Sequence, residues 1–194
     1  MVKNKISHWT PITTVISIII ALVALGFTYI QIKEINRATQ ADFAHRFKVD
    51  FFTDQSCTLM TLFDYNLIIF QTATNKKNPI DFAYFTVDTL RAKELSKKFP
   101  NLFMKKYYSV YEIDNYLLLH FDDLGYYYKR GILDIDFIYD GFDYYVENIY
   151  ENREIQKYLA WVKTDKNSED TYEGFDLIYK ELKKHSSKYH HQCP

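Results

Sequence analysis

Residues that break or cross-link a chain are scarce in this sequence. Its 194 residues include 5 Gly, 4 Pro and 2 Cys, against 18 Tyr and 15 Phe. Few helix breakers and many large side chains favour long helices over a turn-rich β-sandwich. Cys57 and Cys193 lie far apart and provide no disulfide framework, which fits a reducing compartment.

The sequence also lacks the short motifs that mark common active sites. It contains no Walker, Rossmann, hydrolase-elbow or HExxH pattern. The Glu-x-x-His pairs that two-metal carboxylate bundles use are missing as well. We therefore expect a protein that is not an enzyme and that holds no cofactor.

Charged residues are absent from Ile6 to Ile32, and branched apolar side chains fill the middle of this run. About 20 apolar residues, at roughly 1.5 Å rise each, cross a hydrocarbon core of about 30 Å. The run therefore predicts one transmembrane helix over Ile12–Ile32. A cleaved signal peptide is the alternative, since lysines precede the run. The run is longer than a signal h-region, however, and continues into residues 31–34 without a turn.

Positive charge near the two ends of this helix predicts its orientation. Two lysines precede it, whereas four positive residues follow: Lys33, Arg37, Arg46 and Lys48. Because positive flanks stay inside, we expect a single-pass protein of the bacterial inner (plasma) membrane with a cytoplasmic C-terminal domain. Membrane lipid is thus one expected partner.

Beyond the membrane, the chain predicts an all-α fold in which the transmembrane helix continues into a compact domain of about five to seven helices. The expected parts are a short N-terminus and transmembrane helix over 1–32, a helical cytosolic domain over 33–185 and a disordered tail over 186–194. Apolar spacing and breakers predict helices over 32–51, 57–70, 79–98 with an N-cap at 78–79, one or two over 101–130, 135–162 with a bend near Asn152, and 169–184 after a loop at 165–168. Gly125 predicts close packing of another helix against the backbone, Gly131 a C-cap and Asp134 the next N-cap. The first of these carries an apolar stripe without a heptad register, so we expect it to pack on its own domain.

Residues 116–140 read YLLLHFDDLGYYYKRGILDIDFIYD. This stretch resembles a family of uncharacterised bacterial proteins that is defined only as a domain of unknown function. The matching residues are Phe121, Asp123, Leu124, Gly125, Gly131, Asp134 and Tyr139. The resemblance extends to about Lys184 and implies one N-terminal membrane helix and a small helical cytosolic domain, but no activity. The family's Trp after this helix corresponds here to Tyr150 or Trp161.

Two charge clusters are candidate interaction surfaces. The basic cluster comprises Arg91, Lys97, Lys98, Lys105 and Lys106 and is interleaved with Phe99, Phe103, Tyr107 and Tyr108. It fits a solvated face, anionic lipid, the acidic face of a neighbouring copy, or nucleic acid. A membrane-tethered domain favours lipid or protein over nucleic acid.

The acidic cluster comprises Asp136, Asp140, Asp143 and Glu147, which share one face of a helix. It fits a solvated face, a docking site for a basic partner, or a cation site. His120 beside Asp122 and Asp123 fits ordinary surface pairing better than catalysis, because no nucleophile accompanies it. The tail residues His185, His190, His191 and Cys193 can ligate metal, but they lack the folded frame of a zinc site, so no metal is expected.

Small side chains form one face of the predicted membrane helix: Thr14, Ser17, Ala21, Ala24 and Thr28. Small residues let membrane helices approach closely, so this face predicts a homo-oligomer. The function that we expect is a membrane-anchored helical interaction module, an accessory or sensor component of a larger bacterial system with a protein partner still to be identified. A membrane-acting effector or toxin-like oligomer is the alternative.

Overall fold

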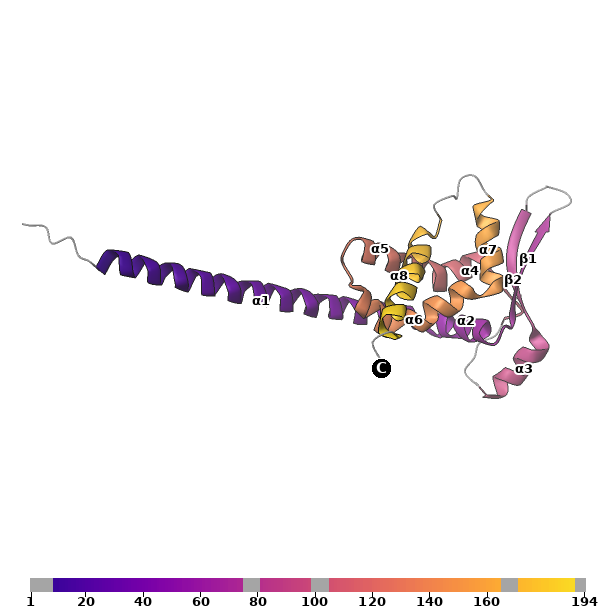
Figure 1. The fold of residues 1–194 in the computed structure, drawn as a ribbon. Coiled ribbons are helices and arrows are strands. Elements are labelled where there is room, and N and C mark those ends of the chain that lie inside the picture. Colours follow the sequence, from indigo (N-terminus) through magenta and orange to yellow (C-terminus); the bar gives the residue numbers. More distant parts are fainter. Residues whose placement is uncertain (1–8, 75–80, 99–104, 165–170, 191–194) are drawn as a thin grey trace, which may run out of the picture. The chain divides into compact units, whose positions relative to one another are not determined.

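The computed structural model describes residues 9–74, 81–98, 105–164 and 171–190 (Figure 1). Most of these residues are helical, as the sequence predicts. The elements are α1 Trp9–Phe51, α2 Asp54–Asp64, β1 Ile68–Thr74, β2 Asp81–Val87, α3 Thr89–Lys98, β3 Tyr107–Ser109, α4 Val110–Ile113, the π-helix η1 Asp114–Leu118, α5 Leu119–Lys129, α6 Ile135–Glu151, α7 Arg153–Lys163 and α8 Glu173–His190.

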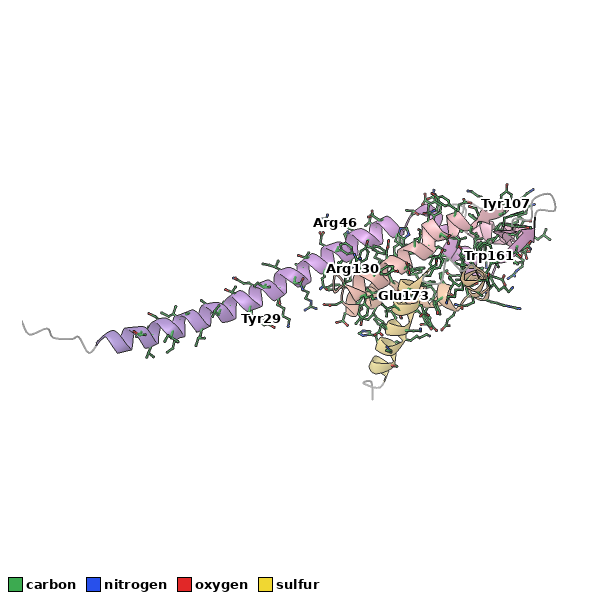
Figure 2. The ribbon with its side chains drawn as sticks, turned by 90° about the horizontal axis from the view of Figure 1, so that it is seen from above. Tyr29, Arg46, Tyr107, Arg130, Trp161 and Glu173 are labelled. Atoms are coloured by element: carbon green, nitrogen blue, oxygen red, sulfur yellow. The ribbon has the colours of Figure 1, made fainter. Side chains whose placement is uncertain are left out.

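Helix α1 is 43 residues long and belongs to both units of the chain. Residues up to Asp42 form one unit, and the compact unit begins at Phe43, ten residues later than the expected boundary after residue 32. Within the described residues, one helix is long and apolar enough to cross a membrane, over Thr14–Phe51. Large apolar side chains between Val15 and Ile32 are 51–71 % exposed. Figure 2 shows side chains projecting from several sides of this helix, Tyr29 among them.

The compact unit contains a three-stranded antiparallel sheet in the order β1-β2-β3. The helices expected over 57–70, 79–98 and 101–130 are therefore wrong at 68–70, 81–87 and 107–109, although helices occupy other parts of those ranges. The helical stretch that ends at Asp64 is followed by Asn66, whose φ of 50° is left-handed and takes the chain out of the helix. The expected N-cap at 78–79 lies outside the described residues.

One face of the sheet is covered by helix α7 (Figure 1). On this inner face Phe85 is fully buried, and the Tyr158 ring of α7 lies 5.6 Å from the rings of both Phe70 and Phe85. The Glu154 carboxylate of α7 accepts a hydrogen bond of 2.9 Å from the backbone N–H of Phe70 on edge strand β1. Helix α7 thus covers the sheet and also occupies a backbone donor at its edge.

Aromatic rings join the last turns of α1 to the rest of the compact unit. Phe47 lies 5.5 Å from Phe142, and Phe51 lies 5.1 Å from Phe121. Phe43 makes an edge contact with Tyr127 at 5.0 Å. The apolar stripe of α1 therefore packs on its own domain over residues 43–51, as expected. Edge-to-face arrangements of this kind add to the burial of the rings.

Helices α5 and α8 cross at two glycines. A Cβ atom on Gly125 would lie 1.9 Å from the carbonyl oxygen of Gly174, so neither position has room for a side chain. The sequence predicted close backbone packing at Gly125 but not its partner. Gly131 has a φ of 66° after α5, and Asp134 stands at the N-cap of α6, both as predicted.

The expected bend near Asn152 is a complete break between α6 and α7. The Asn152 side chain accepts a hydrogen bond from the backbone N–H of Glu154 and caps α7. Helix α8 continues to His190, beyond the helix end expected near Lys184 and into the expected disordered tail. The loop expected at 165–168 lies outside the described residues.

Candidate interaction surface

Helix α3 presents the first part of the basic cluster. The Asp88 carboxylate accepts hydrogen bonds of 3.2 Å from the backbone N–H groups of Leu90 and Arg91, which starts the helix. Ala92 and Leu95 are buried and orient the helix. The opposite side is exposed and carries Arg91, Lys93, Glu94, Lys97 and Lys98.

Most cations of this surface have no acidic partner. Within the described ranges, Lys93, Lys97, Lys98 and Lys106 form no ion pair. Arg91 donates a hydrogen bond of 3.3 Å to the backbone carbonyl of Tyr65. Lysines without a neighbouring carboxylate keep their charge available for a partner, because no carboxylate among the described residues competes for it.

Lys105 differs from the other cations, because it is exposed but forms an ion pair within the chain. Its ammonium group forms an ion pair with Glu112 and lies 5.7 Å from the centre of the Tyr108 ring. The hydrogen bond to Glu112 raises the pKa of Lys105. Phe99 and Phe103 lie outside the described residues. The basic cluster predicted from the sequence therefore has two parts. The cations of α3 and Lys106 form no ion pair with the described residues, whereas Lys105 is paired with Glu112.

The outer face of the sheet was not predicted, and on β3 it adjoins Lys106 through Tyr107. We define the outer sheet face by Ile69, Gln71, Phe82, Tyr84 and Tyr107, whose side chains alternate with the buried ones on β1, β2 and β3. Phe82 is 50 % and Tyr107 67 % exposed. Tyr107 lies at the end of the domain that carries the sheet (Figure 2).

The aromatic side chains of the outer sheet face are ordered by contacts with one another. The Phe82 and Tyr84 rings stack at 5.9 Å with an interplanar angle of 24°. The Tyr84 hydroxyl donates a hydrogen bond of 3.2 Å to the Gln71 side chain. Exposed apolar side chains gathered on one face, with cations nearby, are typical of an interaction site.

The acidic cluster on α6 is engaged by α8, which packs beside it (Figure 1). Lys183 forms ion pairs with Glu147 and, at 3.0 Å, with Glu151. His185 Nε2 lies 3.3 Å from an Asp136 oxygen. Burial raises the pKa of Asp143. Asp136 and Asp140 are exposed, so this part of the face remains open to solvent.

His120, Asp122 and Asp123 have separate structural roles. Asp122 accepts a hydrogen bond of 3.0 Å from the backbone N–H of Phe175 in the first turn of α8. The His120 ring packs against Phe47 and Phe51, and its buried Nδ1 has no hydrogen-bond partner in the structure as described. Burial lowers the pKa of His120, and among the described residues no ion pair joins its ring to Asp122 or Asp123, so the expected surface pairing is not found.

A buried polar cluster around the π-helix η1 was missed from the sequence. Asp114 begins η1 and accepts hydrogen bonds from the hydroxyls of Tyr158, at 2.9 Å, and Tyr172. Burial raises the pKa of all three groups. The cluster links α7 and the segment before α8 to η1 with its polar atoms satisfied, so it stabilises the fold.

Metal ligation finds no support in the described part of the chain. There, no group of three or more His, Cys, Asp or Glu side chains could hold a metal ion. Of the tail residues, His185 lies on α8 against the Tyr139 ring at 4.9 Å. His191 and Cys193 lie outside the described residues, as does the side chain of His190.

The small-residue face of α1 is helical and exposed throughout. Thr14, Ser17, Ala21, Ala24 and Thr28 are all open to solvent. The Thr28 hydroxyl donates a hydrogen bond of 2.9 Å to the carbonyl of Ala24 within the same helix. Its proton is thus already used, and only the oxygen can accept a bond from a second helix.

Comparisons of the chain with protein-family models, curated proteins and solved structures found no match. The resemblance at residues 116–140 therefore does not assign the chain to a family. Of the architecture that it implied, the structure contains the apolar N-terminal helix and the compact helical domain.

Proposed function

We propose that this protein is a membrane-anchored, non-enzymatic interaction module that serves as an accessory or sensor component of a larger bacterial system. The exposed apolar side chains of α1 support the proposal of a membrane anchor, because an apolar helix surface of this length needs lipid or a partner protein to cover it. The positive residues that follow support a cytoplasmic domain on a single-pass anchor in the inner membrane.

Two observations carry the interaction: the exposed aromatic side chains of the outer sheet face, and the lysines of α3, which form no ion pair with the described residues. Phe82 and Tyr107 supply exposed aromatic surface, and Lys93, Lys97 and Lys98 supply charge that no described carboxylate neutralises. Aromatic residues are enriched in the energetic centres of interfaces, and rim charges steer association. The partner that fits is a protein with an acidic rim around an apolar centre.

Site-specific photo-crosslinking in the bacterium that encodes the protein tests this proposal. A benzoylphenylalanine at Phe82 or Tyr107 should crosslink to the same protein, and replacing Lys93, Lys97 and Lys98 with Gln should reduce the yield. The matched control is Tyr144, which is 61 % exposed but lies on α6. Equal crosslinking from Tyr144, or none from the sheet, would refute the proposal.

A membrane-acting oligomer is the second candidate, and the small-residue face of α1 favours it. Replacing Ala21 and Ala24 with Leu should separate the copies without preventing membrane insertion, because bulk prevents close helix approach. Dye uptake by cells that express the protein, lost in this double variant, would support the oligomer. Expression without dye uptake, together with a crosslinked partner protein, would support the interaction module.

A further inference from the structure

A cavity of about 430 Å³ lies between α2, β3 and the beginning of the long helix formed by α4, η1 and α5. Its volume falls within the range of small-molecule sites. Its lining does not include the aromatic residues of the outer sheet face. The cavity is lined by Asp54, Gln55, Thr58, Leu59, Lys105, Tyr108, Glu112 and Tyr116.

Thr58 is the most informative residue of the cavity. It is 5 % exposed, and its hydroxyl forms no hydrogen bond with any residue in the described ranges. Thr61 on the same helix instead donates to the carbonyl of Cys57 at 2.8 Å. The Thr58 hydroxyl is not completely enclosed by protein atoms, unlike His120 Nδ1. Because Thr58 lines the cavity, a ligand in the cavity can reach this hydroxyl. A polar group this deeply buried normally has a partner.

The charges around the cavity favour a positive ligand. Glu112 and Lys105 form an ion pair and neutralise each other. Asp54 then leaves one negative charge at the cavity. The capping of α2 is done by Thr53 and Ser56, so the Asp54 carboxylate is not needed for it.

The aromatic wall of the cavity suits the apolar part of a ligand. The Tyr108 ring already has the Lys105 ammonium group 5.7 Å from its centre, so a ligand's own positive group is left to Asp54. Tyr116 adds a second ring, and the fully buried Leu59 adds apolar surface. A ligand that uses all of these features has a positive group and an apolar part.

We infer that this cavity binds a small organic cation, a protonated amine with an apolar substituent. Its ammonium group pairs with Asp54 and donates a hydrogen bond to the Thr58 hydroxyl, while its apolar part lies against Leu59 and the tyrosine rings. An organic anion is disfavoured, because it would lie beside Asp54 with the only ammonium group of the lining already paired. This inference does not depend on the proposed membrane anchor or protein partner.

The test is calorimetric titration of the full chain in detergent micelles with three ligands of similar shape. Phenethylamine carries a positive charge, phenylethanol is neutral and phenylacetate is negative. We expect saturable binding of the amine and at least about tenfold weaker binding of the other two, the factor that about 1.4 kcal/mol provides. Phenylacetate binding as tightly as the amine, or no saturable binding of the amine, would overturn the inference.

Variants locate the binding in the cavity. Asp54→Asn should remove the preference for the amine over the alcohol, and Thr58→Val should weaken amine binding about fivefold, as loss of one hydrogen bond does. Thr58→Ser keeps the hydroxyl and should bind as the unchanged protein does, which separates loss of binding from loss of folding. Asp140→Asn, an exposed aspartate on α6, is the charge-matched control. Equal affinity in Asp54→Asn and Asp140→Asn would place the ligand elsewhere.

Discussion

Helices α3 and α6 carry charge clusters of opposite sign that look equivalent in the sequence, but their surroundings differ. The carboxylates of α6 meet Lys183 and His185 from α8, which packs beside them. The lysines of α3 meet no carboxylate among the described residues. A run of charge therefore becomes an available surface only where the tertiary neighbours leave it unpaired. By this criterion α3 is the better candidate for a partner.

Separating α8 from the domain would leave the α6 carboxylates unpaired, as the α3 lysines are among the described residues. Of the changes considered, this one should lower the unfolding free energy most. Gly125→Ala places a Cβ against the Gly174 backbone, which has no side chain to move aside. Overpacking of this kind costs about 3 kcal/mol. Urea unfolding of the full chain in detergent micelles, followed by circular dichroism, measures the loss.

Gly141→Ala is the matched control for this prediction. Gly141 lies on α6 with nothing within 4 Å of its added Cβ, so alanine should stabilise the helix by about 0.5 kcal/mol. If both variants unfolded at the same urea concentration, the close crossing of α5 and α8 would be refuted.

Removing one charge from α8 should have a smaller effect. Lys183→Met leaves Glu147 and Glu151 without their cation, but all three side chains are more than a third exposed, so the loss should be about 0.5 kcal/mol. The hydrogen bond from Lys183 lowers the pKa of Glu151 below its ordinary value of 4.5. Stability from a lowered carboxyl pKa is present above that value and lost as pH falls through the folded value.

The difference in unfolding free energy between the unchanged protein and Lys183→Met should thus be present at pH 7 and shrink as the pH falls below 4.5. Urea titrations at pH 7, 5 and 3 measure it. A difference that stayed the same from pH 7 to pH 3 would show that packing of the lysine stem, not its charge, stabilises α6.

Changing the α3 lysines should have the smallest effect on stability. Replacing Lys93, Lys97 and Lys98 with Gln should change the unfolding free energy by less than about 0.5 kcal/mol, because no internal pair is lost. The control replaces three paired lysines of α8, Lys180, Lys183 and Lys184, and should cost more. Equal losses in the two triple variants would mean that α3 has partners within the chain.

The helices were predictable because each buries a single face. In α6 the buried residues Ile138, Phe142, Val146 and Ile149 follow at steps of four, four and three, the spacing of a helical stripe. The strands were not predictable in the same way. The buried Phe85 alternates with Phe82, Tyr84 and other residues of an outer face that is itself aromatic, so no polar–apolar alternation was visible. The aromatic residues of the outer face made the strands hard to predict, and the same residues make this face a candidate interaction surface.

The candidate site was predictable only in part, because it depends on residues far apart in the sequence. The α3 cations could be identified from composition. The pairing of Lys105 with Glu112, and the link of Asp114 to Tyr158 and Tyr172, arise from packing that no spacing indicates. The end of α2 before Asn66, in contrast, could have been predicted from the sequence. Asparagine tolerates a left-handed φ, and its position after Tyr65 could have indicated the end of α2.

Glu154 limits the ways in which copies of this chain can join. An edge strand with free backbone groups can recruit a strand from a second copy, and that copy from a third, which produces an open-ended fibre. On β1 the amide of Phe70 is already bonded to the Glu154 carboxylate, so a strand that paired there would first have to displace it. Growth through the backbone at this point of β1 is therefore disfavoured, which leaves edge strand β3 and the side-chain surfaces as the routes by which copies can join.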